Sequence, residues 1–270
     1  MKKVMFTIFG SKGFIGKNIV NYLNKNNLKS YLPKKNNYIF KRNLGNIIYC
    51  IGKDQVLKNP NYALKANLTL IYKILLNNKF KSFTFLSSAR VYLGNKKTSE
   101  QSDILIKSFE PNFQYNLLKL TAENFCLSLK NSKIRVIRLS NIYGNNFSKQ
   151  DYLLPNLIRE AVNNNRIKIY INKNSQKNYL SIDDAISLIF KIIRKGKFRL
   201  YNVASDRMIK INNIAKLIQK HSNCRIIYQN QNIKINEPTI NINRIKSEFK
   251  FKPTSYIIDD LEGIIKNFKN

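Results

Sequence analysis

The stretch VMFTIFGSKGFIG, residues 4–16, decides the fold. Its first six residues form an apolar run of strand length, and glycines at positions 10, 13 and 16 follow directly. From Ile15 to Leu23 the apolar residues recur at helical spacing, with lysine and asparagine between them. The pattern predicts a buried strand, a glycine turn and an amphipathic helix.

The glycines have the spacing G-x-x-G-x-x-G. One glycine allows a tight turn, one lets a pyrophosphate approach the backbone, and one lets the helix pack closely on the strand. The helix N-terminus adds free N–H groups and a partial positive charge. A merely flexible turn would not need this register. We therefore expect the turn to bind a dinucleotide through Gly10, Ser11, Lys12, Gly13, Phe14, Ile15 and Gly16.

The residues beyond this helix favour NADP over NAD. An acidic residue about 20 positions after the turn would hold the adenosine ribose of NAD. Here the segment LPKKNN, residues 32–37, occupies that place, and the first fifty residues contain no acid. Lys34 and Lys35, together with Lys12 in the turn, would suit a 2′-phosphate. If Lys34 and Lys35 are simply two of the chain's many scattered lysines, NAD stays open.

Apolar runs alternate with helical patterns along the first half of the chain. Strands are predicted at residues 4–9, 30–32, 46–52, 82–87 and 134–139, with helices at 61–78 and 113–130. This order predicts an α/β fold, a doubly wound parallel sheet of the Rossmann type. Shorter elements follow: helices at 153–164, 183–194 and 210–221, and strands near 167–171, 179–182 and 200–203. We expect a dinucleotide-binding domain at 1–145, with a returning segment about 178–198, and a smaller interleaved substrate lobe from 146–177 and 199–270.

The charge is large but evenly spread. The chain has 270 residues, with 48 Lys and Arg against 15 Asp and Glu, and a formal net charge of +33. Nucleic-acid binders cluster their charge, so an even spread favours a solvated basic surface and argues against a nucleic-acid partner. The 43% of hydrophobic residues suffices for a core and excludes a disordered basic tail.

The remaining composition predicts a cytoplasmic protein. No run approaches the ~18 apolar residues of a membrane span, and the N-terminal residues do not resemble a signal peptide. Three widely spaced cysteines, Cys50, Cys126 and Cys224, fit a reducing compartment rather than a disulfide framework. With a single histidine and no C-x-x-C, no metal site is expected.

A tyrosine and a lysine are spaced for acid–base chemistry. Tyr115 and Lys119 form Y-x-x-x-K on a predicted helix, and residues i and i+4 share a helix face. An ammonium near a phenol favours the phenolate and so lowers the phenol's pKa. Ser87 and Ser88 end the strand before, at the edge where parallel sheets bind ligands. Y-x-x-x-K alone is common by chance, but a glycine turn, a strand-end serine and this pair in order are far more specific.

Taken together, these motifs resemble the extended short-chain dehydrogenase/reductases, in the branch of nucleotide-sugar epimerases and dehydratases. The similarity runs through nearly the whole chain. Beyond the motifs above it rests on FLSSARVY at 85–92, RLSNIYG at 138–144, NYLSIDDA at 178–185 and YNVA at 201–204.

The resemblance implies a role for each matching residue. Tyr115 would be the acid/base, Lys119 would lower its pKa and bind the nicotinamide ribose, and Ser88 would position the sugar oxygen. Further cofactor contacts are implied at Ile51, Gly52 and Asn67. Substrate contacts are implied at Ser88, Arg90, Asn141 and Lys177, the last in place of a phosphate-binding arginine. A homodimer is also suggested.

One departure from the family pattern narrows the activity. Dehydratases carry an Asp-Glu pair after the catalytic hydroxyl, where this chain has Ala89 and Arg90. The expected activity is therefore an NAD(P)-dependent reductase or epimerase of a nucleoside-diphosphate sugar, acting at C4, in surface-polysaccharide or deoxysugar biosynthesis. The alternatives are a degenerate member acting as an RNA-binding or regulatory protein, or a noncatalytic cofactor-binding subunit. Retention of Tyr115 and Lys119 speaks against the RNA-binding alternative.

Overall fold

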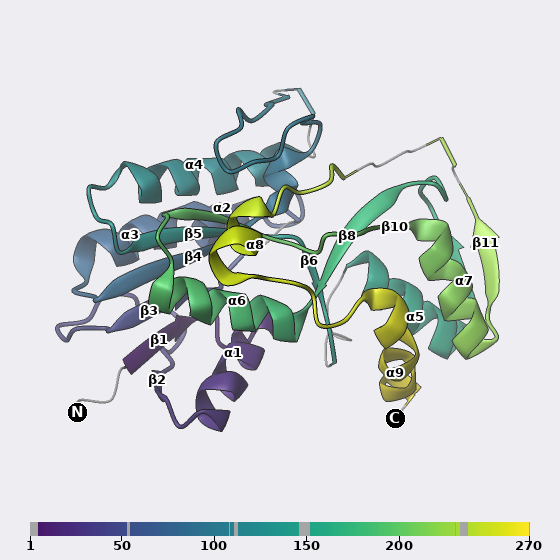
Figure 1. The fold of residues 1–270 in the computed structure, drawn as a ribbon, viewed down its shortest axis with the longest axis horizontal. Helices are drawn as coiled ribbons and strands as arrows, with labels where there is room; N and C mark the ends of the chain where they lie inside the picture. The colour runs from purple at the N-terminus through teal and green to yellow at the C-terminus, as the bar shows by residue number, and fades with distance from the viewer. Residues whose placement is uncertain are drawn as a thin grey trace. The chain divides into compact units, whose positions relative to one another are not determined.

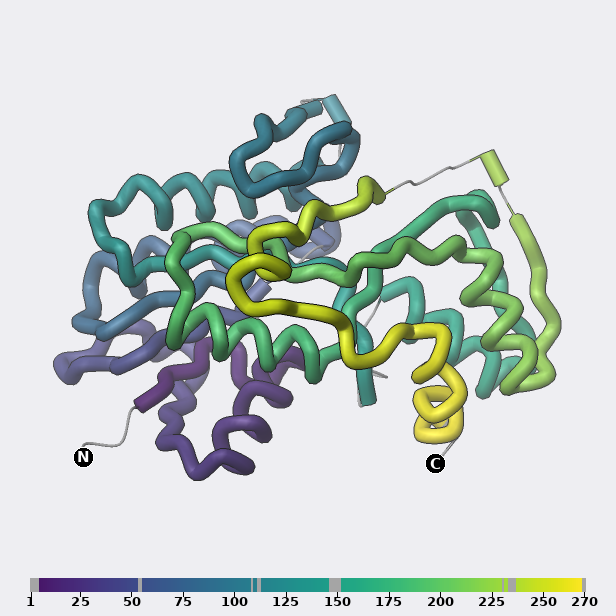
Figure 2. Tube along the Cα trace, viewed as in Figure 1, coloured from purple at the N-terminus to yellow at the C-terminus, as the bar shows by residue number. Residues whose placement is uncertain are grey.

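The computed structural model describes residues 5–52, 55–107, 109–110, 113–145, 152–229, 231–232 and 237–269. The chain divides into two compact units. The first unit comprises Met1–Val91, Asp103–Leu139 and Ile186–Val203, and the second comprises Tyr92–Ser102, Ser140–Ala185 and Ala204–Asn270. The chain therefore passes between the units several times. Figure 2 traces its path, coloured by residue number from the N-terminus to the C-terminus.

The first unit is built on a parallel sheet with strand order β2-β1-β3-β4-β5-β9. The strands are β1 (Met5–Phe9), β2 (Lys29–Tyr31), β3 (Asn46–Tyr49), β4 (Ser82–Ser88), β5 (Ile134–Leu139) and β9 (Leu200–Val203). From β1 the chain first adds β2 on one side and then β3 on the other. Ligands of such sheets bind at the carboxyl ends of the strands beside this reversal. The predicted doubly wound fold is confirmed.

Helices cover both faces of this sheet (Figure 1). On one face, α1 (Phe14–Lys25) meets α6 (Ile182–Lys195), where Tyr22 stacks on Phe190 with ring centres 4.3 Å apart. Phe6 of β1 meets the same Phe190 ring edge-on. On the other face, α3 (Leu70–Asn77) and α4 (Gln114–Ser128) bury their apolar sides in one core cluster with β3, β4 and β5.

The helix predicted at 61–78 has a break in its regularity. Its parts are α2 (Pro60–Leu64), a π-helical turn (Lys65–Thr69) and α3. A π-turn widens a helix by one residue and often marks a functional site. Here the turn carries Asn67, whose side chain is fully buried.

The expected domain boundaries differ from the observed division in four places. Residues 140–145, expected in the first domain, belong to the stretch Ser140–Ala185 of the second unit. Residues 200–203 were expected in the substrate lobe, but β9 pairs with β5, Val136 opposite Leu200, and so completes the first sheet. The returning segment is Ile186–Val203 rather than about 178–198, because residues 176–181 form β8 in the second unit. Residues 92–102, expected in the first domain, belong to the second unit.

The second unit contains two small sheets and several helices. One sheet has the order β10-β8-β6, and in the other β7 pairs with β11. Its elements are β6 (Asn141–Tyr143), α5 (Leu153–Asn164), β7 (Arg166–Ile169), β8 (Gln176–Ser181), β10 (Met208–Lys210), α7 (Ile211–Ser222), β11 (Arg225–Tyr228), α8 (Asn243–Phe249) and α9 (Ile257–Lys269). The helices predicted at 153–164 and 210–221 are confirmed.

Two features are absent from the part of the chain that the structure describes. None of the helices is both long enough and apolar enough to cross a membrane. No three His, Cys, Asp or Glu side chains in this part of the chain gather as a metal-ion site. The three cysteines are free thiols.

Candidate active site

The glycine turn needs glycine at two of its three glycine positions. Gly10 has φ +87°, and a Cβ there would lie 2.9 Å from the backbone nitrogen of Ile51. A Cβ on Gly16 would lie 2.1 Å from the carbonyl oxygen of Gly10. A Cβ on Gly13 would meet that oxygen at 3.4 Å, an ordinary contact. Gly10 therefore makes the turn, and Gly16 lets α1 sit close on it.

The start of α1 carries no capping side chain. Gly13 is the N-cap, and its nitrogen donates to the carbonyl of Gly10 at 3.0 Å. The first-turn N–H groups of a helix have no partner within the helix and favour an anion. Lys12 is exposed beside this helix start. The turn thus fits the pyrophosphate of a dinucleotide.

Lys34 and Lys35 are both exposed and lie a few residues after the end of β2. Because β2 and β1 are parallel neighbours, the segment after β2 leaves the sheet at the same edge as the glycine turn. The placement is compatible with a 2′-phosphate contact. Preference for NADP over NAD stays a prediction.

Tyr115 and Lys119 lie on α4, the lysine buried and the tyrosine half-buried. The Lys119 Nζ donates to the carbonyl oxygen of Leu86 at 3.3 Å and lies 5.7 Å from the centre of the Tyr115 ring. Burial lowers the pKa of Lys119 to about 8, against the opposing effects of Glu123 and Cys50. The ammonium therefore prevails at neutral pH, close to a phenol that it can acidify.

Three residues expected to bind the cofactor come together from separate segments. A Cβ on Gly52 would lie 3.4 Å from Lys119 Nζ and 3.5 Å from Asn67 Oδ1. The space above Gly52 is therefore a cradle bordered by an ammonium and an amide oxygen. Hydroxyl groups, such as those of a ribose, match this pairing of a donor and an acceptor. The residues present thus fit a nicotinamide dinucleotide.

The two serines at the end of β4 have different surroundings. The buried Ser87 donates its hydroxyl hydrogen to Glu123. Ser88 is half-buried, and its Oγ accepts from the backbone N–H of Arg90 at 3.2 Å. Arg90 places its guanidinium carbon 5.7 Å from the centre of the Tyr115 ring. Arg90 thus lies near Tyr115, and its backbone contacts Ser88.

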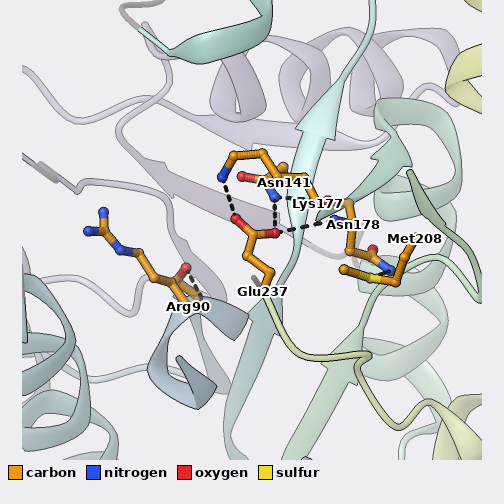
Figure 3. A network of polar contacts seen from close by, with 7 residues as sticks. Arg90, Asn141, Lys177, Asn178, Met208 and Glu237 are labelled. Carbon is orange, nitrogen blue, oxygen red and sulfur yellow. Dashed lines mark hydrogen bonds and ion pairs between the residues drawn. The ribbon is translucent and has the colours of Figure 1, made fainter. Parts of the chain in front are cut away.

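In the second unit, the predicted substrate residues Asn141 and Lys177 converge on Glu237, a carboxylate that sequence reasoning missed (Figure 3). Lys177 Nζ donates to Glu237 Oε1 at 2.6 Å, and Asn141 Nδ2 donates to Oε2 at 2.8 Å. The backbone N–H of Asn178 adds a third donor at 3.2 Å. No motif pointed to Glu237, since nearly 60 residues separate it from β8.

Cys50 follows β3 close to the cofactor residues, yet it does not suit nucleophilic chemistry. Burial raises its pKa to about 12, with Lys119 only partly opposing. The protonated thiol is a poor nucleophile. Cys50 is therefore not a candidate for the acid–base chemistry expected of Tyr115 and Lys119.

Comparison with known proteins gives one family. Residues 39–204 match the NAD dependent epimerase/dehydratase family. The dTDP-D-glucose 4,6-dehydratase of Dictyostelium discoideum is 32% identical over an alignment of 156 residues, which covers 53% of this chain and 35% of that protein. The chain thus spans about a third of that relative's length.

Solved structures share the fold over nearly the whole chain. RMD from Pseudomonas aeruginosa, in complex with NADPH, is 20% identical with a TM-score of 0.80, covering 98% of this chain and 100% of that one. The UDP-glucose 4-epimerase of Thermotoga maritima, with UDP-glucose, is 14% identical with a TM-score of 0.81, covering 98% of both chains. At these identities the likeness establishes the fold.

Proposed function

Because the chain belongs to the NAD-dependent epimerase/dehydratase family, we propose that it is an enzyme that oxidises or reduces a carbon of a nucleoside-diphosphate sugar. The observation that carries this proposal is the meeting of Lys119, Asn67 and Gly52 around a cradle one helical turn from Tyr115. A nicotinamide ribose bound in this cradle would lie beside the proposed acid–base pair, Tyr115 and Lys119. The solved structures above that hold NADPH or UDP-glucose support the same pairing of ligands.

Each residue of the first unit has a separate task in this proposal. The glycine turn and the start of α1 bind the pyrophosphate. Lys119 and Asn67 bind the nicotinamide ribose. Ser88 donates to the sugar oxygen and orients it, while Tyr115 gives a proton to that oxygen or takes one from it. A nicotinamide dinucleotide held by these residues would supply or accept the hydride.

The proposal favours a reductase or an epimerase acting at C4 of the sugar. Elimination of water needs a further acid and base, and the two residues after Ser88 are Ala89 and Arg90. Reduction or epimerisation needs only the hydroxyl, the phenol and hydride transfer. We place the reaction in the cytoplasm, in surface-polysaccharide or deoxysugar synthesis, and the homodimer stays a prediction.

NADP is the proposed cofactor, on the strength of the exposed Lys12, Lys34 and Lys35. The test is fluorescence titration of the protein with NADPH and NADH. We expect tighter binding of NADPH, and we expect K34A/K35A to narrow the difference. Equal affinities in the native protein, or retention of NAD through purification, would overturn this part of the proposal.

Substrate binding is proposed for Asn141, Lys177 and Arg90. Lys177 and Asn141 both donate hydrogen bonds to the Glu237 carboxylate. The same two donors could bind the diphosphate of the substrate, which would then compete with Glu237 for them. We expect Lys177→Met to raise the KM for the nucleotide sugar while NADPH affinity stays unchanged. An unchanged KM would remove Lys177 from the substrate site.

The experiment that tests the function is turnover of a panel of nucleoside-diphosphate sugars and 4-keto sugars with NADPH or NAD. We expect one sugar class to be turned over by the native protein and not by Tyr115→Phe. If Tyr115→Phe kept full function, and binding to RNA fell steeply with salt, the protein would be the RNA-binding alternative.

A further inference from the structure

A buried cluster of polar side chains lies one helical turn beyond Lys119. Glu123 of α4 is 2% exposed, and its Oε2 accepts from Arg138 Nε at 2.9 Å and from Arg138 Nη2 at 2.6 Å. Its Oε1 accepts from the hydroxyl of Ser87. Arg138 belongs to β5 and Ser87 to β4. The carboxylate therefore fixes α4 to the two strands beneath it.

The spacing along α4 places this carboxylate on the side of the helix that carries Lys119. Residues 119 and 123 are i and i+4, and both are buried. Water and salt screen a buried pair of charges much less than an exposed pair. Glu123 therefore acts on the Lys119 ammonium more strongly than an exposed carboxylate would.

The other groups that face Lys119 cannot replace Glu123. The carbonyl oxygen of Leu86 accepts its hydrogen bond, and the rings of Phe85 and Tyr115 lie 4.8 and 5.7 Å from Nζ. The Cys50 thiol stays protonated, because burial raises its pKa to about 12. Burial lowers the pKa of Lys119 to about 8, and Glu123 is the largest influence that raises it again.

Building on the function proposed above, we propose that Glu123 is a positioning residue that keeps the Lys119 ammonium charged at its place between Tyr115 and the cradle at Gly52. Arg138 and Ser87 hold the carboxylate in turn. Because both carboxylate oxygens of Glu123 are bonded to Ser87 and Arg138, we expect Glu123 to act through Lys119 and not by contact with a ligand. Its loss should therefore change how binding at the cradle depends on pH, beyond any effect on folding.

The test is the dissociation constant of NADPH, measured by fluorescence across the pH range in which Lys119 titrates. In the native protein we expect binding to weaken as pH rises through about 8, where Lys119 loses its charge. In Glu123→Gln the weakening should begin about one pH unit lower. The variant would then bind roughly eightfold more weakly than the native protein at about pH 8.5, but nearly as well at about pH 6.5.

Two further variants show whether the charge of Glu123 causes the shift in the pH dependence of NADPH binding. Glu123→Asp keeps the carboxylate and should restore the native pH dependence. Glu160→Gln removes a carboxylate that accepts the backbone N–H of Lys168 in the second unit, and should leave the curve unchanged. A Glu123→Gln curve that overlays the native one, or is displaced by one constant factor at every pH, would overturn the proposal.

A folding failure of Glu123→Gln would still leave a test. The double variant E123L/R138M removes both members of the ion pair, a replacement that buried pairs often tolerate. It should show the same displacement toward lower pH, and a native curve would overturn the proposal. Because NADPH binding needs no substrate, the result is independent of turnover. If Tyr115→Phe abolishes turnover but Glu123→Gln binds NADPH with a native pH dependence, the proposed function stands and the role of Glu123 fails.

Discussion

Ser87 and Ser88 are neighbours on β4 with opposite commitments: Ser87 is buried and donates to Glu123, whereas Ser88 is half-buried and accepts from the backbone of Arg90. Alternation along a strand sends consecutive side chains to opposite faces. The hydroxyl of Ser87 is therefore structural, whereas that of Ser88 can contact a ligand. The sequence pattern alone does not distinguish the two serines.

Ser88→Ala should lower kcat by about a hundredfold, because the sugar oxygen loses a hydrogen-bond donor. Affinity for NADPH should stay unchanged. Ser82→Ala is the matched control: Ser82 is a buried hydroxyl at the other end of β4, bonded to Asn46. Steady-state kinetics and NADPH titration of both variants decide the matter. Equal losses of kcat in the two variants would remove Ser88 from the site.

The glycine turn predicts a contrast between two alanine variants. Gly16→Ala puts a Cβ 2.1 Å from a backbone oxygen, so the helix must move. We expect it to cost about 1–3 kcal/mol of stability and to weaken NADPH binding. Gly13→Ala meets only a 3.4 Å contact within the protein and should leave stability nearly unchanged. Thermal unfolding compares the two variants, and equal destabilisation would contradict the packing described for Gly16.

Lys119 should make stability depend on pH in the alkaline range. Its pKa falls from 10.5, its ordinary value, to about 8 in the folded protein. Between these values the unfolded chain binds more protons, so this group's contribution to stability rises as pH rises. Below about pH 8 its burial costs about 3 kcal/mol, the free energy equivalent of the shift.

Lys119→Met removes that cost. The variant should unfold at a higher temperature than the native protein at neutral pH, and the difference should shrink toward pH 10.5. It should also lose turnover, because no ammonium remains beside Tyr115. Melting curves at a series of pH values test the first point. A constant difference between the two proteins at every pH would show that Lys119 does not titrate in this window.

Breaking the buried ion pair from one side should be far more costly than removing it. Arg138→Met leaves Glu123 buried with its main partner gone, and we expect a loss of about 3–5 kcal/mol. The double variant E123L/R138M should recover most of that loss. Denaturant unfolding of the native protein and both variants measures the difference. Equal destabilisation in the single and double variants would contradict the pairing.

Local pattern was enough to predict much of this fold. The strand, glycine turn and helix at residues 4–25, and the strands at β4 and β5, follow from apolar periodicity and turn glycines. The placement of β9 could not be predicted in this way. Its assignment to the first unit depends on pairing with β5, some 60 residues earlier. The same limit explains the misplaced boundary at residue 199.

The candidate site divides along the same line. Tyr115, Lys119 and the strand-end serines are visible because helical and strand spacing fixes their relation. Glu237 could not be identified from the sequence, because its contacts with Lys177 and Asn178 join segments about 60 residues apart that no local pattern links. The sequence places Glu123 one helical turn after Lys119. Only the structure shows that its carboxylate is buried and accepts hydrogen bonds from Arg138 and Ser87.

The most direct measurement is transfer of deuterium from NADPH labelled at the nicotinamide C4. The labelled cofactor is incubated with the native protein and a panel of 4-keto nucleoside-diphosphate sugars, and the sugar product is read by mass spectrometry and NMR. We predict deuterium on C4 of the sugar with the native protein and none with Tyr115→Phe, although that variant still binds NADPH. Tight NADPH binding with no label on any sugar, or equal labelling by Tyr115→Phe, would contradict the proposed reaction.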